Sequence, residues 1–237
     1  MSEKGPFESA AGDRPRFFGR RRGKALRRNA LSLIDEVLPR LAIAVPPPQS
    51  RMEPVSLFAT PVSEVWLEVG FGGGEHLAHL AEANPEIGLI GCEVFRNGIA
   101  SLLGHVQARG LGNVRIFAED ARLLLPALPD AALGRVFVLF PDPWPKTRHV
   151  ERRFICRENL DEIARLLRDG GELRVASDDP VYVHWAAQQL DAHPLLEPVL
   201  ATTDRARVPA DWPASRYEQK CITGRAPTFF LYRRKPR

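Results

Sequence analysis

From Val65 to the C-terminus, short apolar runs alternate with segments that have the periodicity of amphipathic helices. We expect strands at 65–69, 87–93, 114–118, 136–140, 172–176, 196–202 and 228–233. We expect helices at 75–82, 98–109, 121–128, 151–167 and 180–192. Strands that alternate with helices favour right-handed crossovers and a mostly parallel sheet covered on both faces. The sequence therefore predicts an α/β fold built on a sheet of seven strands.

The start of the chain is set apart by its charge, because the stretch from 14 to 28 is strongly basic and contains no acid. The basic residues in it are Arg14, Arg16, Arg20, Arg21, Arg22, Lys24, Arg27 and Arg28. Phe17 and Phe18 lie between them, and the last residues of the chain are also rich in arginine. Basic and aromatic residues together favour nucleic acid as the partner, whereas a basic stretch alone is also typical of a solvated tail. We interpret residues 1–28 as a flexible basic arm.

The arm is followed by a segment with helical periodicity. Leu31, Ile34, Leu38 and Leu41 recur at steps of three and four, which predicts a helix with one apolar face. The prolines at 46–48 end this pattern. We therefore predict a docking helix and a proline-rich linker at 29–55, and one α/β domain at 56–237.

The composition excludes several classes of protein. A hydrophobic content of 44% and a charged content of 26% are typical of a soluble globular chain. The three cysteines are far apart and form no CxxC pair, so we expect neither a disulfide framework nor a metal site. No apolar run approaches the length of a membrane span, and the N-terminus lacks the apolar core of a signal peptide. We predict a cytoplasmic protein with no membrane partner, and either a monomer or a homodimer.

A glycine-rich turn, Gly70-Phe-Gly72-Gly-Gly-Glu75, joins the first predicted strand to the first predicted helix. Glycines there allow a ligand to approach the backbone closely. In a dinucleotide-binding fingerprint the third glycine would stand at Glu75, and a carboxylate at the helix N-terminus repels a pyrophosphate. S-adenosylmethionine has no phosphate and carries a sulfonium, so the turn favours it over NAD or FAD.

Four acids end successive predicted strands, namely Glu68, Glu93, Asp120 and Asp142. Opposite charges at about 4 Å attract by about 4 kcal/mol at an effective dielectric near 20, so Glu68 favours a cationic ligand. Glu93 has the spacing of acids that bind ribose hydroxyls. Asp120 is suited to accept a hydrogen bond from an adenine amino group, or to cap the helix at Ala121. Each acid alone is compatible with a cap or surface role, but together they predict one crevice at one sheet edge.

The segment Pro141-Asp142-Pro143-Trp144-Pro145-Lys146 follows the fourth predicted strand. We expect its prolines to hold each preceding residue in extended geometry. A carboxylate, an indole and an ammonium group at such a strand end suit a purine and its phosphate. The alternative is a structural connection whose tryptophan covers the core. We also expect Trp144 either to stack on the base or to form a wall of the pocket.

These motifs resemble the bacterial tRNA (guanine-N7-)-methyltransferases, which belong to the class I S-adenosylmethionine-dependent methyltransferases. The resemblance rests on the glycine turn with its strand-end acids, on the loop from Phe140 to Lys146 with Arg148-His149, on Ser177-Asp178, and on Ser215-Arg-Tyr-Glu218. It implies a Rossmann-like class I methyltransferase fold. In that fold a mostly parallel seven-stranded sheet has helices on both faces and an antiparallel C-terminal strand.

The resemblance also implies an activity, which is methyl transfer from S-adenosylmethionine to N7 of guanine 46 in the variable loop of tRNA, without a metal. It implies cofactor contacts at Glu68, Gly70, Gly72, Glu93, Asp120 and Asp142. It implies tRNA contacts at Lys146, Asp178, Ser215, Arg216, Tyr217 and Glu218. Guanine N7 carries a free lone pair and no proton, so we expect positioning to dominate and Asp142 to stabilise the charge that develops on the base.

Two alternatives belong to other classes of function. An exocyclic-amine methyltransferase has a loop of similar composition, although here one proline separates Asp142 from Trp144 and another precedes Asp142. Analysis of the methylated nucleoside distinguishes this alternative, because only N7 methylation leaves a fixed positive charge. A non-catalytic RNA-binding module would explain the basic ends. A module of that kind would be expected to lose the strand-end acids, and all four are present.

Overall fold

The computed structural model describes residues 19–214, 218 and 224–237, and the seven predicted strands all form within them. The strands are β1 (Glu64–Val69), β2 (Ile87–Cys92), β3 (Val114–Phe117), β4 (Leu133–Leu139), β5 (Leu167–Ser177), β6 (Leu196–Thr202) and β7 (Thr228–Arg234). They form one sheet in the order β3-β2-β1-β4-β5-β7-β6. Only β7 runs antiparallel to its neighbours β5 and β6. The predicted mostly parallel sheet with an antiparallel C-terminal strand is confirmed.

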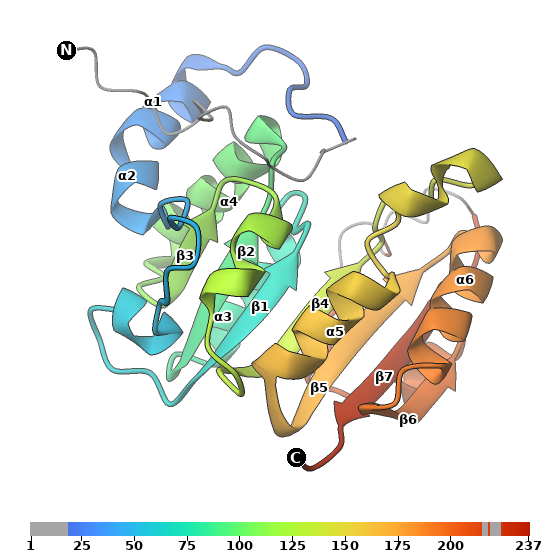
Figure 1. Ribbon diagram of the computed structural model, residues 1–237. Helices are drawn as coiled ribbons and strands as arrows, with labels where there is room; N and C mark the ends of the chain where they lie inside the picture. Colours follow the sequence, from blue (N-terminus) through green and yellow to red (C-terminus); the bar gives the residue numbers. More distant parts are fainter. Residues whose placement is uncertain (1–18, 215–217, 219–223) are drawn as a thin grey trace.

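Helices cover both faces of the sheet (Figure 1). The longer ones are α1 (Arg28–Glu36), α3 (Glu75–Ala83), α4 (Arg96–Arg109), α5 (Arg157–Leu166) and α6 (Pro180–Asp191). Residues of β1 alternate between two cores, because Val65 and Leu67 pack with α5 and α6 whereas Trp66 packs with α3 and α4. This alternation follows from the two-residue repeat of a strand and explains why the strand is apolar throughout.

The predicted docking helix is divided into α1 and a short α2 (Leu38–Leu41). Pro39 explains the break, since proline removes a backbone donor and its ring displaces the carbonyl one turn earlier. Ile34 and Leu38 are nevertheless buried in the core that also contains α4. Just after α2, Ile43 donates a backbone hydrogen bond of 2.8 Å to Ile116 on β3. The apolar face therefore docks on the main body as its periodicity predicts.

Two of the predicted helices differ from the structure. Residues 121–128 form two 3₁₀ turns, η2 (Ala121–Leu123) and η3 (Leu125–Ala127), because Pro126 cannot continue an α-helical ladder. The helix predicted from 151 begins only at Arg157, after a separate 3₁₀ turn η4 (Thr147–Arg152). The extended segment between them is held by tertiary contacts, since Ile155 N donates to the Tyr182 hydroxyl at 3.2 Å.

The parallel strands end at one edge of the sheet, and Gly70, Gly72, Glu93, Asp120 and Asp142 follow those ends. The remaining 3₁₀ turns, η1 (Pro54–Leu57) and η5 (Arg205–Arg207), lie in the connections before β1 and after β6. Within the described ranges, none of the helices combines the length and the apolar character that a membrane crossing requires. The division into arm, docking segment and methyltransferase domain stays a prediction.

Candidate active site

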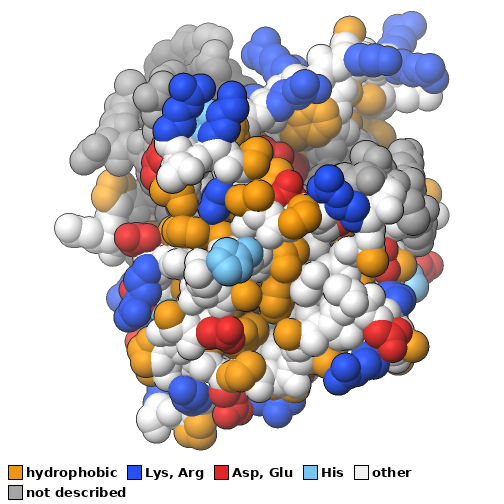
Figure 2. All heavy atoms as spheres, turned by 90° about the vertical axis from the view of Figure 1, so that its right-hand side faces the viewer, with side chains coloured by type: hydrophobic (Ala, Val, Ile, Leu, Met, Phe, Trp, Pro, Cys, Tyr) orange, Lys and Arg blue, Asp and Glu red, His pale blue; other side chains and the backbone are white. Residues whose placement is uncertain are grey.

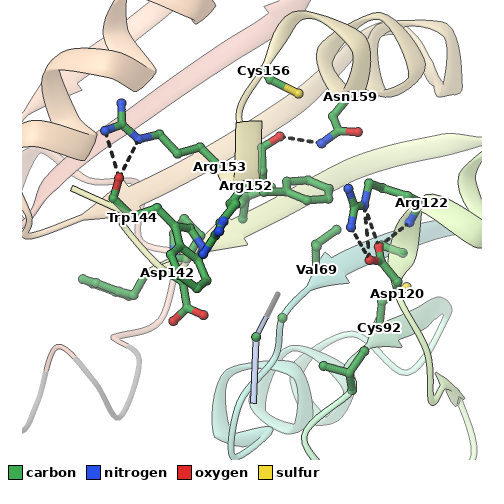
Figure 3. Close-up of a pocket in the computed structure, with 18 of the residues that line it drawn as sticks. Val69, Cys92, Asp120, Arg122, Asp142, Trp144, Arg152, Arg153, Cys156 and Asn159 are labelled. Atoms are coloured by element: carbon green, nitrogen blue, oxygen red, sulfur yellow. Dashed lines mark hydrogen bonds and ion pairs between the residues drawn. The ribbon is translucent and has the colours of Figure 1, made fainter. Parts of the chain in front are cut away.

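A cavity of about 910 Å³ opens where the parallel strands end. Five of the predicted cofactor residues line it, namely Gly70, Gly72, Glu93, Asp120 and Asp142. They come from the ends of β1, β2, β3 and β4, which lie side by side in the sheet. Figure 3 shows Asp120 with Arg122 at one side of the cavity and Asp142 with Trp144 at the other, with Val69 between them. The predicted convergence of strand-end acids is therefore present for three of the four acids.

The glycine turn needs its glycines for their conformation. Gly70, Gly72 and Gly74 all have positive φ, at 71°, 57° and 79°. This left-handed region costs other residues steric strain, so the turn selects glycine. A Cβ on Gly73 would collide with the Glu75 carboxylate, which therefore lies against the turn at the start of α3. An acid at this helix N-terminus disfavours a pyrophosphate, as the sequence indicates.

A second glycine contact was not predicted from the sequence. A Cβ on Gly98 would overlap the carbonyl oxygen of Gly72, so Gly98 lets the first turn of α4 pack directly against the glycine turn. A glycine in the first turn of a helix was the only signal for this contact.

We expect Gly98→Ala to destabilise the protein by about 1–3 kcal/mol, the range for a group forced into a packed site. Displacement of Gly72 should also weaken cofactor binding. Thermal unfolding and calorimetric titration with S-adenosylmethionine measure the two effects. Gly112→Ala is the matched control, because a Cβ added at that position would meet no other atom within 4 Å. Wild-type behaviour of Gly98→Ala would contradict the proposed close packing.

Glu93 connects the end of β2 to the glycine turn by a hydrogen bond. Its carboxylate accepts backbone hydrogen bonds from Gly72 at 2.8 Å, Val94 at 2.8 Å and Phe95 at 2.9 Å. Burial raises the pKa of the Glu93 carboxyl, these three hydrogen bonds oppose the rise, and the nearby charge of Asp142 adds to it. Glu93 therefore shapes the cavity as well as lining it.

Asp120 is 7% exposed and caps η2, because its Oδ1 accepts a hydrogen bond of 3.0 Å from Arg122 N. The Arg122 guanidinium also donates to both carboxylate oxygens, with the shortest contact at 2.6 Å. This pairing raises the pKa of Arg122. The cap role considered for Asp120 is thus confirmed, although it caps a 3₁₀ turn, and the partnership with Arg122 was not predicted.

Glu68 is not among the residues that line the cavity. It is 3% exposed, and its Oε2 lies 2.8 Å from Nδ1 of the equally buried His76 on α3. The His76 ring packs edge-on against Phe137, with centroids 5.2 Å apart. Sequence analysis did not identify His76 as a partner of Glu68. What could have indicated His76 in the sequence is its position in the first turn of the helix that follows the glycine turn.

The loop after β4 does not have the predicted backbone geometry. Phe140 and Trp144 both precede prolines and were expected to be extended, yet their φ values are +51° and +42°. Non-glycine residues in this region cost about 1–3 kcal/mol each, so the surrounding contacts must hold the loop in place. Arg153 supplies one such contact, because its guanidinium donates to the Trp144 carbonyl at 3.0 and 3.3 Å.

Two arginines that follow the loop contact Trp144 or the side chains near it. Arg153 is 6% exposed, and its guanidinium lies 5.0 Å from the ring centroid of Trp185. It is therefore not a surface charge, although it lines the cavity. The Arg152 guanidinium lies 5.0 Å from the ring centroid of Trp144. His149 packs edge-on against the same indole at 5.8 Å, so Trp144 is fixed at the cavity wall.

Basic side chains gather at the edge where the cavity opens. Figure 2 shows Lys and Arg side chains concentrated at the top of the molecule, which is the edge that the parallel strands approach in Figure 1. Arg20, Arg22, Lys24, Lys146 and Arg148 are exposed. Asp142 is exposed, and Asp178 is half-buried directly after β5. Lys146 and Asp178 are therefore both in segments that follow strands at this edge.

Of the four residues predicted to bind substrate near the C-terminus, Ser215, Arg216 and Tyr217 lie outside the described residues. Glu218 is described, and its Oε1 lies 3.1 Å from Nε of Arg205. Arg205 also donates to the Trp212 carbonyl at 2.5 Å, and Trp212 is 1% exposed. Glu218 is thus connected to a buried anchor in the connection after β6. Within the described part of the chain, no group of three or more His, Cys, Asp or Glu is arranged to hold a metal.

Comparison with solved structures identifies the architecture. A 16S rRNA methyltransferase, KamB, aligns with a TM-score of 0.53 at 16% identity, over 74% of this chain and 89% of KamB. The cyclase SpnF aligns with a TM-score of 0.52 at 18% identity, over 76% of this chain and 77% of SpnF. At these identities the likeness concerns the fold alone. It is the class I methyltransferase fold that the sequence motifs imply.

Sequence comparison is more specific. Residues 63–231 match a family model described as putative methyltransferase. The tRNA (guanine-N(7)-)-methyltransferase of Paramagnetospirillum magneticum is 76% identical over 230 residues, which are 97% of each chain. The enzyme of that name from Rhodospirillum rubrum is 50% identical, over 100% of this chain and 92% of its own. The chain therefore belongs to the tRNA (guanine-N(7)-)-methyltransferase family.

Proposed function

We propose that this protein transfers a methyl group from S-adenosylmethionine to N7 of a guanine in tRNA, at position 46 of the variable loop. The observation that carries the proposal is the cavity in which the glycine turn, Glu93, Asp120 and Asp142 meet the loop that holds Trp144. The family to which the chain belongs supports the same activity. The reducing cytoplasm, where tRNA is modified, is the compartment we propose.

The cavity fits the proposed cofactor in three respects. Its volume of about 910 Å³ lies at the upper end of the range for small-molecule sites, which leaves room for a base beside the cofactor. Its acids suit a ligand that combines hydroxyl and amino donors with a positive charge. The Glu75 carboxylate lies against the glycine turn, where a dinucleotide would place its pyrophosphate.

Glu93 is proposed to accept hydrogen bonds from the ribose hydroxyls and Asp120 one from the adenine amino group. Gly70 and Gly72 would allow the backbone to approach the ligand. Glu68 does not line the cavity, and its hydrogen bond to His76 sets its orientation. A direct contact of Glu68 with the cofactor stays a prediction.

The reaction requires alignment more than proton transfer. S-adenosylmethionine, when bound, supplies an electrophilic methyl group on a sulfonium sulfur. The N7 lone pair would form the new bond to that methyl carbon and the sulfur would leave with the electrons of the carbon–sulfur bond, so no base would be needed. The protein has to hold the guanine ring in line with the methyl group, and such positioning contributes about 7–11 kcal/mol.

Asp142 is proposed to be the catalytic residue. Methyl transfer places a positive charge on the guanine, and a fixed carboxylate beside the ring interacts more strongly with that charged state than with the neutral base. Asp142 lines the cavity together with Glu93. Its carboxylate can also accept hydrogen bonds from the Watson–Crick donors of guanine. Trp144 is proposed to form the wall against which the base lies, since neighbouring side chains fix its ring.

The RNA backbone is proposed to lie across the basic edge, with Lys146, Asp178 and the segment from Ser215 to Glu218 as contacts. We expect Lys146→Ala to weaken tRNA binding and to reduce the slope of log affinity against log salt by about one, because one phosphate contact is lost. S-adenosylmethionine affinity should not change. Filter binding over a salt series measures this effect.

Arg168→Ala is the matched control for Lys146→Ala. Arg168 is half-exposed and pairs with Glu64 at the opposite edge of the sheet, where β1 and β5 begin. Its replacement should leave tRNA binding and the salt slope as in the wild type. Equal losses from both variants would show that only net charge matters and would contradict a specific role for Lys146.

Incubation of the protein with unmodified tRNA and methyl-labelled S-adenosylmethionine tests the proposed function. Label should appear in 7-methylguanosine, and chain cleavage at that base should map to the variable loop. Label in an exocyclic-amine product would overturn the N7 assignment and keep the cofactor. Binding of tRNA without any label would favour the non-catalytic alternative.

A further inference from the structure

In the described part of the basic arm, Arg21 pairs with a buried acid of the main body. The Arg21 guanidinium donates three hydrogen bonds of 3.1–3.2 Å to the carboxylate of Glu119. Glu119 is 6% exposed, whereas Arg21 is exposed, as are its neighbours Arg20 and Arg22. An ion pair with a buried partner and several hydrogen bonds restricts the arm more than a surface pair would.

Further contacts hold the arm against the start of α4 and the loop that precedes it. The Arg21 carbonyl accepts from Arg96 N at 3.0 Å, and Gly23 N donates to Asn97 Oδ1 at 3.0 Å. The Asn97 amide in turn donates to the Lys24 carbonyl at 2.8 Å. Gly23 lies so close to Phe95 that a Cβ would be 2.8 Å from the ring. Backbone and side chains therefore fix the path of residues 21–24.

This path brings the arm to the cavity. Gly19 and Arg20 line it together with Phe95 and Glu119. Glu119 directly precedes Asp120, and the loop that receives the arm directly follows Glu93. The arm is thus attached to the neighbours of both acids that are proposed to bind the adenosine part of the cofactor. In Figure 1 the described arm, in blue, crosses above the edge where the parallel strands end.

We infer that residues 19–24 are a wall of the cofactor site, and that Arg21, Glu119 and Asn97 are positioning residues that retain S-adenosylmethionine. The inference rests on the cofactor assigned under the proposed function. Within the arm, Arg20 lines the cavity itself, whereas Arg21 acts through Glu119, which also lines it. The sequence predicted only an RNA-binding role for the whole cluster.

The test compares Arg21→Ala with Arg22→Ala in full-length protein, using calorimetry for affinity and stopped-flow for dissociation of S-adenosylmethionine. Loss of hydrogen bonds to a charged group should raise the Kd of Arg21→Ala about tenfold, mainly through faster dissociation. Arg22→Ala should keep the wild-type Kd. Because loss of Arg21 leaves Glu119 buried without this partner, thermal unfolding accompanies each measurement.

Two further variants separate retention of the cofactor from stability. The double variant Arg21→Ala/Glu119→Gln also removes the buried charge. Its Kd for S-adenosylmethionine should match that of Arg21→Ala, because both substitutions break the same contact. Asn97→Ala frees the same segment and should also speed dissociation while Glu119 stays paired. The inference is overturned if the Kd and the dissociation rate of S-adenosylmethionine stay within about twofold of the wild type in both Arg21→Ala and Asn97→Ala. A twofold change is no larger than the usual error when effects of separate substitutions are added. Failure of the wild type to bind S-adenosylmethionine would instead overturn the proposed function.

Discussion

Asp142→Asn should lower the methyl-transfer rate at saturating substrates by at least about 10²–10³, the range for removal of one preorganised electrostatic group. The asparagine keeps the shape of the side chain and removes the charge that is proposed to face the guanine. Single-turnover kinetics with labelled cofactor measure the chemical step apart from product release. A wild-type rate would contradict the catalytic role.

The fold should tolerate this substitution. Asp142 is exposed, and the structure shows no hydrogen bond or ion pair from its side chain to another described residue. The melting temperature should therefore be that of the wild type. Asp142→Ala should be as inactive as Asp142→Asn, because both lack the charge. If Asp142→Asn were active while Asp142→Ala was inactive, hydrogen bonding rather than charge would be the source of catalysis.

Asp142→Asn should also change the pH dependence of cofactor binding. The Asp142 charge is one of the causes that raise the pKa of Glu93, so its removal should lower that pKa. The carboxylate form of Glu93 is the one that accepts hydrogen bonds from ribose. Affinity for S-adenosylmethionine falls as pH falls through the Glu93 pKa, and this fall should move to lower pH in the variant. Calorimetric titrations over a pH series measure the shift.

Glu93→Ala should reduce S-adenosylmethionine affinity at least about a hundredfold. The substitution removes the proposed ribose acceptor and leaves three backbone donors, on Gly72, Val94 and Phe95, without their carboxylate. Each hydrogen bond to a charged group contributes about 1.5–3 kcal/mol, so two of them suffice for this loss. Equilibrium dialysis with labelled cofactor covers the expected range of affinities.

Glu93→Gln and Glu82→Gln complete this experiment. Glutamine keeps one acceptor oxygen at position 93 and should lose less affinity than alanine. Glu82 lies on the exposed side of α3, where it pairs with Arg109 at 2.9 Å, so its substitution should leave the affinity unchanged. Similar affinities for Glu93→Ala and the wild type would exclude Glu93 from the cofactor site.

Much of the site could be predicted because it follows strand ends. Parallel strands bring their carboxyl ends to one edge, so Glu93, Asp120 and Asp142 meet in one cavity although the chain separates them. Pro39 and Pro126 explain two of the helices that were predicted too long, since each interrupts a pattern whose apolar periodicity continues. Residues 151–156 contain no proline and were also predicted as helix, but tertiary contacts such as the hydrogen bond from Ile155 N to the Tyr182 hydroxyl hold them outside α5.

The sequence by itself determined the fold class, the glycine turn and the family, because these depend on periodicity, on backbone freedom and on motifs of adjacent residues. Only the tertiary structure decided which partner each charged side chain takes. Glu68 pairs with His76, Asp120 with Arg122, and Arg21 with Glu119. The third of these pairs spans 98 positions of the chain. Such contacts depend on burial and on the geometry of packed elements, and a side chain's charge alone does not specify them.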